Sequence, residues 1–175
     1  MKSKQRTLFR NNKSAGFLLL VVCTMLLTKV QAQDAKTQFI GTWSLETVVN
    51  TNADGHKTWP YGKNPDGLLV FTAGNEYAIQ ILKPGRPKVV ANNKNRTTPE
   101  ENAALVQGSN SHYGTYTVDT TNHTITFNVK HAFYPNWEGA KQVRSYTLEK
   151  GVLTYIVTNT TQGRSATAKV VWKRK

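Results

Sequence analysis

Arg144 is the side chain of this sequence whose setting best suits the binding of an anion. It lies in Gln142–Glu149, a segment in which residues alternate in polarity as in a β-strand. A period of two places Arg144 on the same face as Tyr146 and Leu148. If that face points inward, the guanidinium needs a carboxylate from the protein or from a ligand, because an unpaired buried charge is costly. The alternative is a position at the rim, where Arg144 is solvated or pairs with Glu138.

Aromatic residues are numerous and could supply the rest of a binding cavity. Ring faces and phenol hydroxyls at inward positions suit a ligand that is partly apolar and partly polar. Tyr77, Tyr116 and Tyr146 lie in segments expected to be strands, whereas Trp59, Tyr61 and Trp137 lie in loops. We therefore predict that the three tyrosines face a ligand and that the three loop aromatics surround the cavity mouth. The alternative for each is packing in the core or against a loop.

Sequence signatures of common enzymes and metal sites are missing. The sequence has no Gly-x-Ser-x-Gly, no phosphate-binding loop, no dinucleotide fingerprint and no His-Glu-x-x-His. The four histidines, at positions 56, 112, 123 and 131, do not have zinc-ligand spacing. The carboxylates fall mostly on turns and polar faces, and no pair of them stands out as an acid/base couple. We therefore predict no catalytic residue, no metal ligand and no cofactor.

The first 32 residues have the pattern of a cleavable export signal. Residues 1–13 carry five basic side chains and no acidic one, residues 15–27 form an apolar run, and Val30-Gln31-Ala32 is a small-residue cleavage site. The apolar run is shorter than the roughly 20 residues of a transmembrane helix. We predict a signal peptide over residues 1–32, cleaved after Ala32, and one domain over residues 33–175 in the periplasm or outside the cell. An uncleaved membrane anchor is the alternative.

The predicted mature part differs from the whole chain in cysteine content and in charge. Cys23 is the only cysteine, so residues 33–175 hold neither a thiol nor a disulfide, which favours a bacterial protein. Six of the 23 basic residues and none of the ten acidic residues precede Gln33, so the net charge falls from +13 to +7. Outside residues 83–96 and the C-terminal tail the bases are scattered, which argues against binding of nucleic acid. We predict a solvated basic surface with at most peripheral contact to membranes.

Alternating segments separated by short turns predict an all-β protein. In the first segment, Phe39, Trp43, Leu45, Thr47 and Val49 share one face. About eight strands in sequential hairpins are expected, over residues 39–50, 67–72, 76–82, 112–119, 123–130, 142–149, 152–159 and 165–173. An antiparallel up-and-down barrel of eight strands has no free edge and leaves room inside for one small ligand.

A single helix is expected, in an insertion between the third and fourth strands. Residues 83–95 are polar and broken by prolines and a glycine, so they predict a loop. Thr98-Pro99-Glu100-Glu101 then combines a capping threonine, a proline at the first helical position and acidic residues in the first turn. The helix is expected to end at Gly108. Because the insertion is mostly polar, we do not favour a protein-interaction role for it.

Several stretches resemble one family of known proteins. Phe39-Ile40-Gly41-Thr42-Trp43 is similar to the Gly-x-Trp signature of lipocalins, and Tyr134-Pro135-Asn136-Trp137-Glu138-Gly139 followed by Gln142-Val143-Arg144 is the most specific match. Trp59-Pro60-Tyr61-Gly62, Tyr113–Asp119 and Trp172-Lys173-Arg174 follow the same pattern, so residues 37–174 resemble the bacterial lipocalin-like domain family. The resemblance implies a barrel with an internal cavity. It also implies structural roles for Trp43, which would close the barrel floor, and for Arg174, which would lie across the Trp43 ring.

Two functions from different classes follow from these expectations. The first is a non-enzymatic exported binder that holds one small, largely hydrophobic molecule with a polar or anionic end. The second is a cofactor-independent isomerase, cyclase or lyase that acts inside the barrel through Tyr116, His112, Tyr146 and Arg144. A titratable group beside Arg144 in the cavity favours the enzyme, and a purely apolar cavity favours the binder. We favour the binder.

Overall fold

A computed structural model describes residues 37–158, 160–161 and 166–175, so the predicted signal peptide and its cleavage site lie outside the described residues. Within those ranges the strands are β1 (Gly41–Thr51), β2 (Lys57–Thr58), β3 (Asp66–Phe71), β4 (Glu76–Leu82), β5 (Ser109–Asp119), β6 (Thr124–Ala132), β7 (Lys141–Glu149), β8 (Val152–Val157) and β9 (Thr167–Arg174). None of the helices in this part of the chain is long and apolar enough to cross a membrane.

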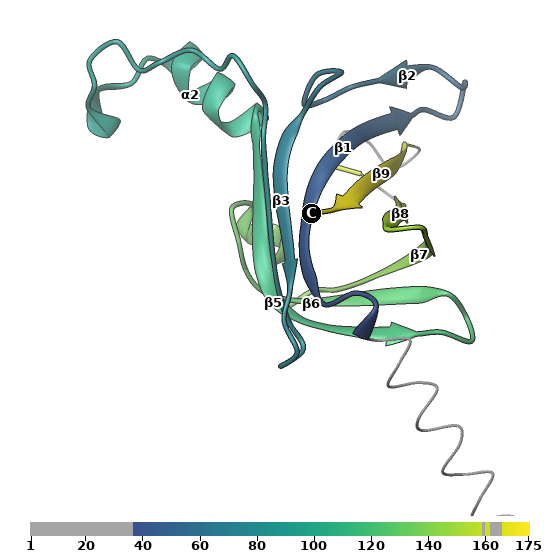
Figure 1. The fold of residues 1–175 in the computed structure, drawn as a ribbon. Coiled ribbons are helices and arrows are strands. Elements are labelled where there is room, and N and C mark those ends of the chain that lie inside the picture. Colours follow the sequence, from purple (N-terminus) through teal and green to yellow (C-terminus); the bar gives the residue numbers. More distant parts are fainter. Residues whose placement is uncertain (1–36, 159, 162–165) are drawn as a thin grey trace, which may run out of the picture. The chain divides into compact units, whose positions relative to one another are not determined.

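The strands form a closed antiparallel barrel (Figure 1). Their order is β2-β1-β3-β4-β5-β6-β7-β8-β9, and β1 also pairs with β9, which closes the sheet. The two-residue β2 only extends the edge of β1 beyond β3, at the pairs Asn50–Thr58 and Thr51–Lys57. The predicted eight-stranded up-and-down barrel is therefore confirmed.

A bulge in β1 changes which of its side chains point into the barrel. β1 and β9 pair in register from Trp43–Arg174 to Leu45–Trp172, and the register then shifts by one residue before Thr47–Val171. Glu46 is the extra residue, and an extra residue reverses the inward and outward alternation that follows it. The sequence-based assignment of Thr47 and Val49 to the Trp43 face is therefore wrong, because Val48 and Asn50 are buried instead.

Aromatic side chains fill one end of the barrel, here called the floor: Phe39, Trp43, Phe71, Tyr116 and Tyr146. Phe39 meets Phe71 and Tyr146 edge-on, with ring centroids 5.9 and 5.0 Å apart, and the rings of Phe71 and Tyr116 are 4.5 Å apart. Nε1 of Trp43 donates to the carbonyl of Phe39 over 2.9 Å. These contacts leave the floor filled by the protein's own side chains.

Arg174 covers the floor from the last strand. Its Cζ lies 4.2 Å from the centroid of the Trp43 ring, and its Nη1 donates to the carbonyl of Ile40 over 2.7 Å. A guanidinium over an indole stabilises such a packing by about 0.5–2 kcal/mol. Gly41 leaves room for this contact, since a Cβ there would lie 2.8 Å from Nη1 of Arg174.

Gly114 allows β5 and β6 to approach each other closely. The register between these strands shifts between Tyr113–His131 and Gly114–Val129, so Lys130 is an extra residue in β6. A Cβ on Gly114 would lie 2.0 Å from the carbonyl oxygen of Asn128. Glycine is thus required here by the backbone of the neighbouring strand.

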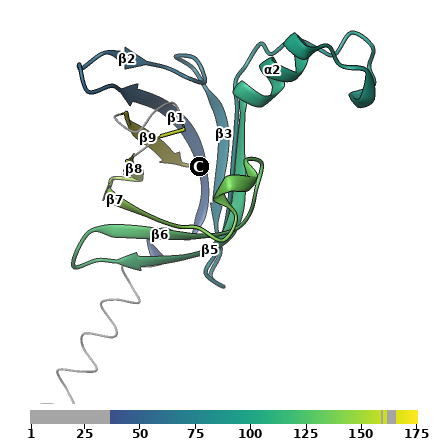
Figure 2. The ribbon, with the colours of Figure 1, turned by 180° about the vertical axis from the view of Figure 1, so that it is seen from behind.

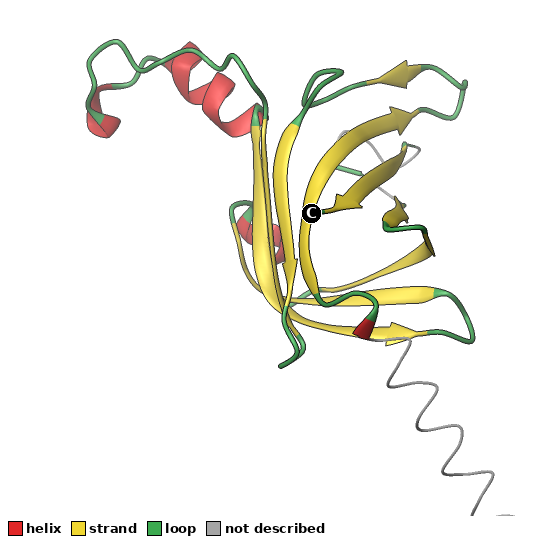
Figure 3. Cartoon of the chain, viewed as in Figure 1, coloured by secondary structure: helices red, strands yellow, loops and turns green. Residues whose placement is uncertain are grey.

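The insertion between β4 and β5 projects from the rim of the barrel, as Figures 1 and 2 both show. It contains a short 3₁₀ turn, η1 (Lys94–Arg96), and the helix α2 (Pro99–Gln107). Thr98 and Glu101 form a reciprocal capping box, and Gly108 ends the helix, so the predicted helix is confirmed with its boundaries. A second 3₁₀ turn, η2 (Pro135–Trp137), lies in the connection between β6 and β7 (Figure 3).

Candidate functional site

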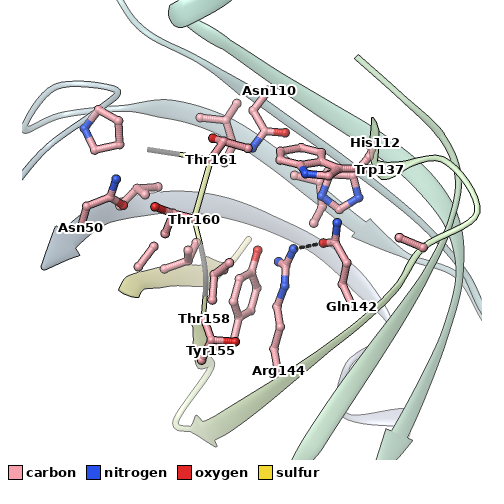
Figure 4. Close-up of a pocket in the computed structure, with 18 of the residues that line it drawn as sticks. Asn50, Asn110, His112, Trp137, Gln142, Arg144, Tyr155, Thr158, Thr160 and Thr161 are labelled. Atoms are coloured by element: carbon pink, nitrogen blue, oxygen red, sulfur yellow. Dashed lines mark hydrogen bonds between the residues drawn. The ribbon is translucent and has the colours of Figure 1, made fainter. Parts of the chain in front are cut away.

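A cavity of about 500 Å³ lies inside the barrel at the end away from the floor. Its volume is within the range of about 300–1,000 Å³ that is usual for small-molecule sites. Apolar side chains of β1, β4, β8 and β9 line it, together with polar side chains of β5 and β7. Figure 4 shows the polar ones: Asn110 and His112, Gln142 and Arg144. The apolar side chains include Val48, Ile79, Ile81, Val157 and Val170. The cavity therefore offers an apolar surface and a polar surface to the same molecule.

Arg144 projects from β7 into this cavity, and its guanidinium lies against two aromatic rings. Its Cζ is 4.7 Å from the ring centroid of Phe127 and 4.7 Å from that of Tyr155, and Figure 4 shows Tyr155 beside it. The side chain is 7% exposed. Nη2 of Arg144 donates to Oε1 of Gln142, which lies two residues earlier on the same face of β7. The two rings and the amide hold the guanidinium in one place.

The positive charge of Arg144 has no carboxylate partner among the described residues. The ion pair recorded in that part of the chain joins His131 and Glu138 on the outside of the barrel. Nε of Arg144 is buried and has no hydrogen-bond partner in the described structure. The described residues that line the cavity include Lys141 and Arg144 but no aspartate or glutamate. The cavity is therefore electropositive.

His112 reaches the cavity from β5 and is 4% exposed. Its Nδ1 lies 2.8 Å from Oη of Tyr77, and its ring meets that of Trp137 edge-on with centroids 5.7 Å apart. Burial, with the nearby charge of Arg144, lowers the pKa of His112 to about 3. Burial also raises the pKa of Tyr77.

Both groups of this pair are consequently neutral near pH 7. We infer that the protonated hydroxyl of Tyr77 donates to Nδ1 of His112, because Nδ1 is the side-chain partner within hydrogen-bond distance of that hydroxyl; this arrangement places the imidazole proton on Nε2. Because the ring of His112 lines the cavity, Nε2–H is a donor that a ligand can meet. His112 thus adds a neutral hydrogen-bond donor to the charged donors of Arg144.

Five residues line both this cavity and a neighbouring one: Pro60, Tyr61, Asn110, Trp137 and Thr161. Three of them, Tyr61, Asn110 and Trp137, are here called the neck. Tyr61 lies in the connection from β2 to β3, Asn110 is on β5, and Trp137 ends η2. Burial raises the pKa of Tyr61, and a hydrogen bond from the Asn110 side chain partly offsets this effect. Oδ1 of Asn110 is buried and has no partner in the described part of the chain.

Comparison with known proteins places this geometry in a family. A sequence model described as the lipocalin-like domain matches residues 40–175, which include all the barrel strands. The chain belongs to the lipocalin-like domain family. None of the curated proteins matches the chain. Barrels of this size typically enclose one small ligand, so the fold suggests that this lipocalin-like protein binds a small molecule.

The lipocalin-like barrel places only some of the predicted binding residues at the cavity. Arg144, Tyr61 and Trp137 line it. Tyr77 does not line the cavity, but its hydroxyl lies within hydrogen-bond distance of His112, which does. Among the described residues, no three His, Cys, Asp or Glu side chains gather as metal ligands.

Three of the predicted binding residues lie elsewhere in the lipocalin-like barrel. Tyr116 and Tyr146 belong to the floor, where they pack on Phe71 and Phe39. Alternation predicted their inward face correctly, but it does not say how deep along the barrel axis a residue lies. Trp59 is 39% exposed, and Nζ of Lys63 lies 5.8 Å from its ring centroid.

Most of the residues that line the cavity were not among the predicted ligand contacts; those discussed here are Asn50, Asn110, His112, Gln142 and Tyr155. The bulge at Glu46 turns Asn50 inward, and the sequence pattern gave no sign of it. Asn110 precedes the predicted start of its strand. Gln142 lies two residues before Arg144, so the alternation of the strand places both on one face, and the sequence alone could have identified Gln142 as a cavity residue.

Proposed function

We propose that the protein is exported and that its barrel binds one small amphipathic molecule, with the anionic end of that molecule at Arg144. The observation that carries this proposal is a buried guanidinium with no carboxylate partner among the described residues and with an unpartnered Nε. A buried charge without a partner costs several kcal/mol. A carboxylate or similar anion from a ligand offsets that cost through charge-assisted hydrogen bonds.

The other walls of the cavity define the rest of the ligand. Val48, Ile79 and Val170 belong to its apolar lining, so an apolar body buries surface there at about 25 cal/mol per Å². Nε2–H of His112 suits a carbonyl or a second anion oxygen. The ligand is thus mainly hydrophobic with an oxygen-rich end.

Export rests on the sequence pattern of residues 1–32, with its basic start, apolar run and small-residue cleavage site. We propose that the mature protein begins at Gln33 and works in the periplasm or outside the cell. Mass measurement of the protein secreted by an expressing host tests this. A mass that corresponds to residues 33–175 supports the proposal, and an intact first methionine in the purified membrane or cytoplasmic fraction contradicts it.

The position of His112 beside the cavity also favours a second candidate, a cofactor-independent isomerase, cyclase or lyase. A neutral imidazole and a guanidinium together can stabilise an enolate oxygen. Proton abstraction needs a base as well, and the low pKa of His112 makes it a poor base near pH 7. The described lining of the cavity supplies no carboxylate for that step. We therefore favour binding over catalysis.

Native mass spectrometry of the protein, purified without detergent, tests the binding function. A reproducible added mass that organic extraction removes, and that proves to be an organic acid, is the expected result. In Arg144→Met the added mass is absent. Because methionine removes an uncompensated buried charge, we expect the ligand-free variant to be at least as stable as the ligand-free wild type. A strong loss of stability in Arg144→Met would instead make the residue a structural one and overturn the proposal.

A further inference from the structure

A second cavity of about 550 Å³ lies next to the first and shares the neck with it. Tyr61, Asn110 and Trp137 line both cavities. The second cavity is here called the vestibule. It is further lined by residues at the base of the insertion, among them Lys83, Arg86 and Ser109, and by Phe133 and Tyr134 before η2. It therefore lies between the projecting insertion and the connection of β6 to β7.

The vestibule has an aromatic and apolar surface and two cations. Phe133 and Tyr134 are neighbours in the chain, line the vestibule and are about half exposed, at 46% and 42%, so they present ring surface to it. Lys83 and Arg86 are the charged residues among its described lining, which contains no aspartate or glutamate. A molecule in the vestibule thus meets aromatic rings and two positive charges.

Arg86 is held in a fixed position. Its Nε donates to the carbonyl of Lys83 over 3.1 Å, and its Nη1 donates to Oγ of Ser109 over 2.7 Å. A guanidinium has five N–H donors, so these two bonds orient the group and leave others for a ligand. A fixed guanidinium loses less side-chain entropy when it binds an anion than a freely rotating one does.

The neck joins the two spaces and supplies a polar contact between them. The rings of Tyr61 and Trp137 offer an apolar surface to both cavities. Oδ1 of Asn110 is a buried acceptor without a partner in the described structure. A ligand that passes through the neck can therefore keep an apolar middle against the rings and satisfy Asn110 with a hydroxyl or N–H.

We propose that the inner cavity and the vestibule bind the two ends of one elongated molecule that is anionic at both ends. This inference rests on the proposed function, because Arg144 holds the inner end. Arg86 and Lys83 hold the outer end, and the rings of the neck and vestibule hold the apolar middle. The ligand class is a long-chain dicarboxylic acid or an acid whose far end carries another anionic group.

Affinities of three probes, measured by isothermal titration calorimetry with the purified protein, test this inference. The probes are octanoate, hexadecanoate and hexadecanedioate. The diacid is expected to bind about tenfold more tightly than hexadecanoate, because its second carboxylate can form one more charge-assisted hydrogen bond, which is partly solvated. Arg86→Gln and Lys83→Gln each reduce that advantage and leave octanoate binding unchanged. Lys88→Gln is the matched control, since it removes an exposed cation from the same loop outside both cavities.

The outcomes separate this inference from the function on which it rests. If none of the probes binds to the wild type, or if all bind equally well to Arg144→Met, the proposed function fails. If octanoate binding needs Arg144 but the diacid gains nothing over hexadecanoate, only the two-ended ligand is overturned. Two octanoates per chain together with no advantage of the diacid likewise exclude a single ligand that spans the neck.

Discussion

Lowering the pH from 7.5 to 5 is expected to destabilise the barrel through His112. In the folded protein the pKa of this imidazole is lowered to about 3, chiefly by burial. In the unfolded chain a histidine has a pKa of about 6.5. Because the unfolded state binds the proton first, the stability that the neutral imidazole contributes is present above pH 6.5 and is lost as the pH falls toward 3.

The size of the effect follows from the two pKa values. Between pH 7.5 and 5 the unfolded histidine becomes almost fully protonated while the folded one stays neutral. The free energy of unfolding then falls by about 2 kcal/mol from this one group, at a limiting slope of about 1.4 kcal/mol per pH unit. Carboxylates contribute mainly at lower pH, so the window from 7.5 to 5 isolates the histidine best.

Urea denaturation of the wild type and of His112→Gln, at a series of pH values, measures the effect. The difference in stability between the two proteins is expected to change by about 2 kcal/mol from pH 7.5 to 5. Tyr77→Phe is the control: it removes the hydrogen bond to Nδ1 but leaves the imidazole buried, so its stability should fall with pH as the wild type's does. Parallel curves for the wild type and His112→Gln would refute the placement of His112 in a desolvated cavity.

Three further substitutions test the parts of the fold that position the site. Gly114→Ala should lower the free energy of unfolding by about 3 kcal/mol or more, because the added Cβ meets a neighbouring backbone oxygen. Gly74→Ala is the control, since the atom nearest to its Cβ is 3.6 Å away. An equally small effect of both substitutions would contradict this reasoning. Arg174→Ala should lower stability by about 1–3 kcal/mol and change the fluorescence of Trp43, because a cation–π contact and a hydrogen bond are lost. Thr98→Ala should destabilise the helix α2 by about 1 kcal/mol, because the capping hydrogen bond is lost. The expected result is about fivefold faster amide hydrogen exchange in α2, while the melting temperature of the barrel stays unchanged.

The sequence predicts those parts of the structure that local chemistry determines. The helix boundaries follow from Thr98, Pro99 and Gly108, since capping involves only neighbouring residues. The barrel follows from alternation repeated over eight segments. Alternation also places Arg144 on the face of Tyr146 and Leu148. Whether that face points inward, and the burial of Arg144 against Phe127 and Tyr155, depend on strands that the sequence does not place.

The parts that could not be predicted depend on how strands meet. The bulge at Glu46 exists because β1 pairs with β9, far away in the sequence, and it decides that Asn50 faces the cavity. How deep along the barrel axis a side chain lies also depends on how distant strands pair. His112 and Tyr116 lie on one face of one strand, yet the first lines the cavity and the second packs in the floor.

The closure of the barrel by β1 and β9 has a consequence for the order of folding. One edge of β1 pairs only with the last strand, β9, with Trp43 opposite Arg174 and the amide of Lys175 donating to the carbonyl of Thr42 over 3.0 Å. A chain still being synthesised therefore cannot complete the barrel before β9 has been made, because one edge of β1 remains unpaired until then. The closed cavity and the complete floor therefore form only after β9 has joined the sheet.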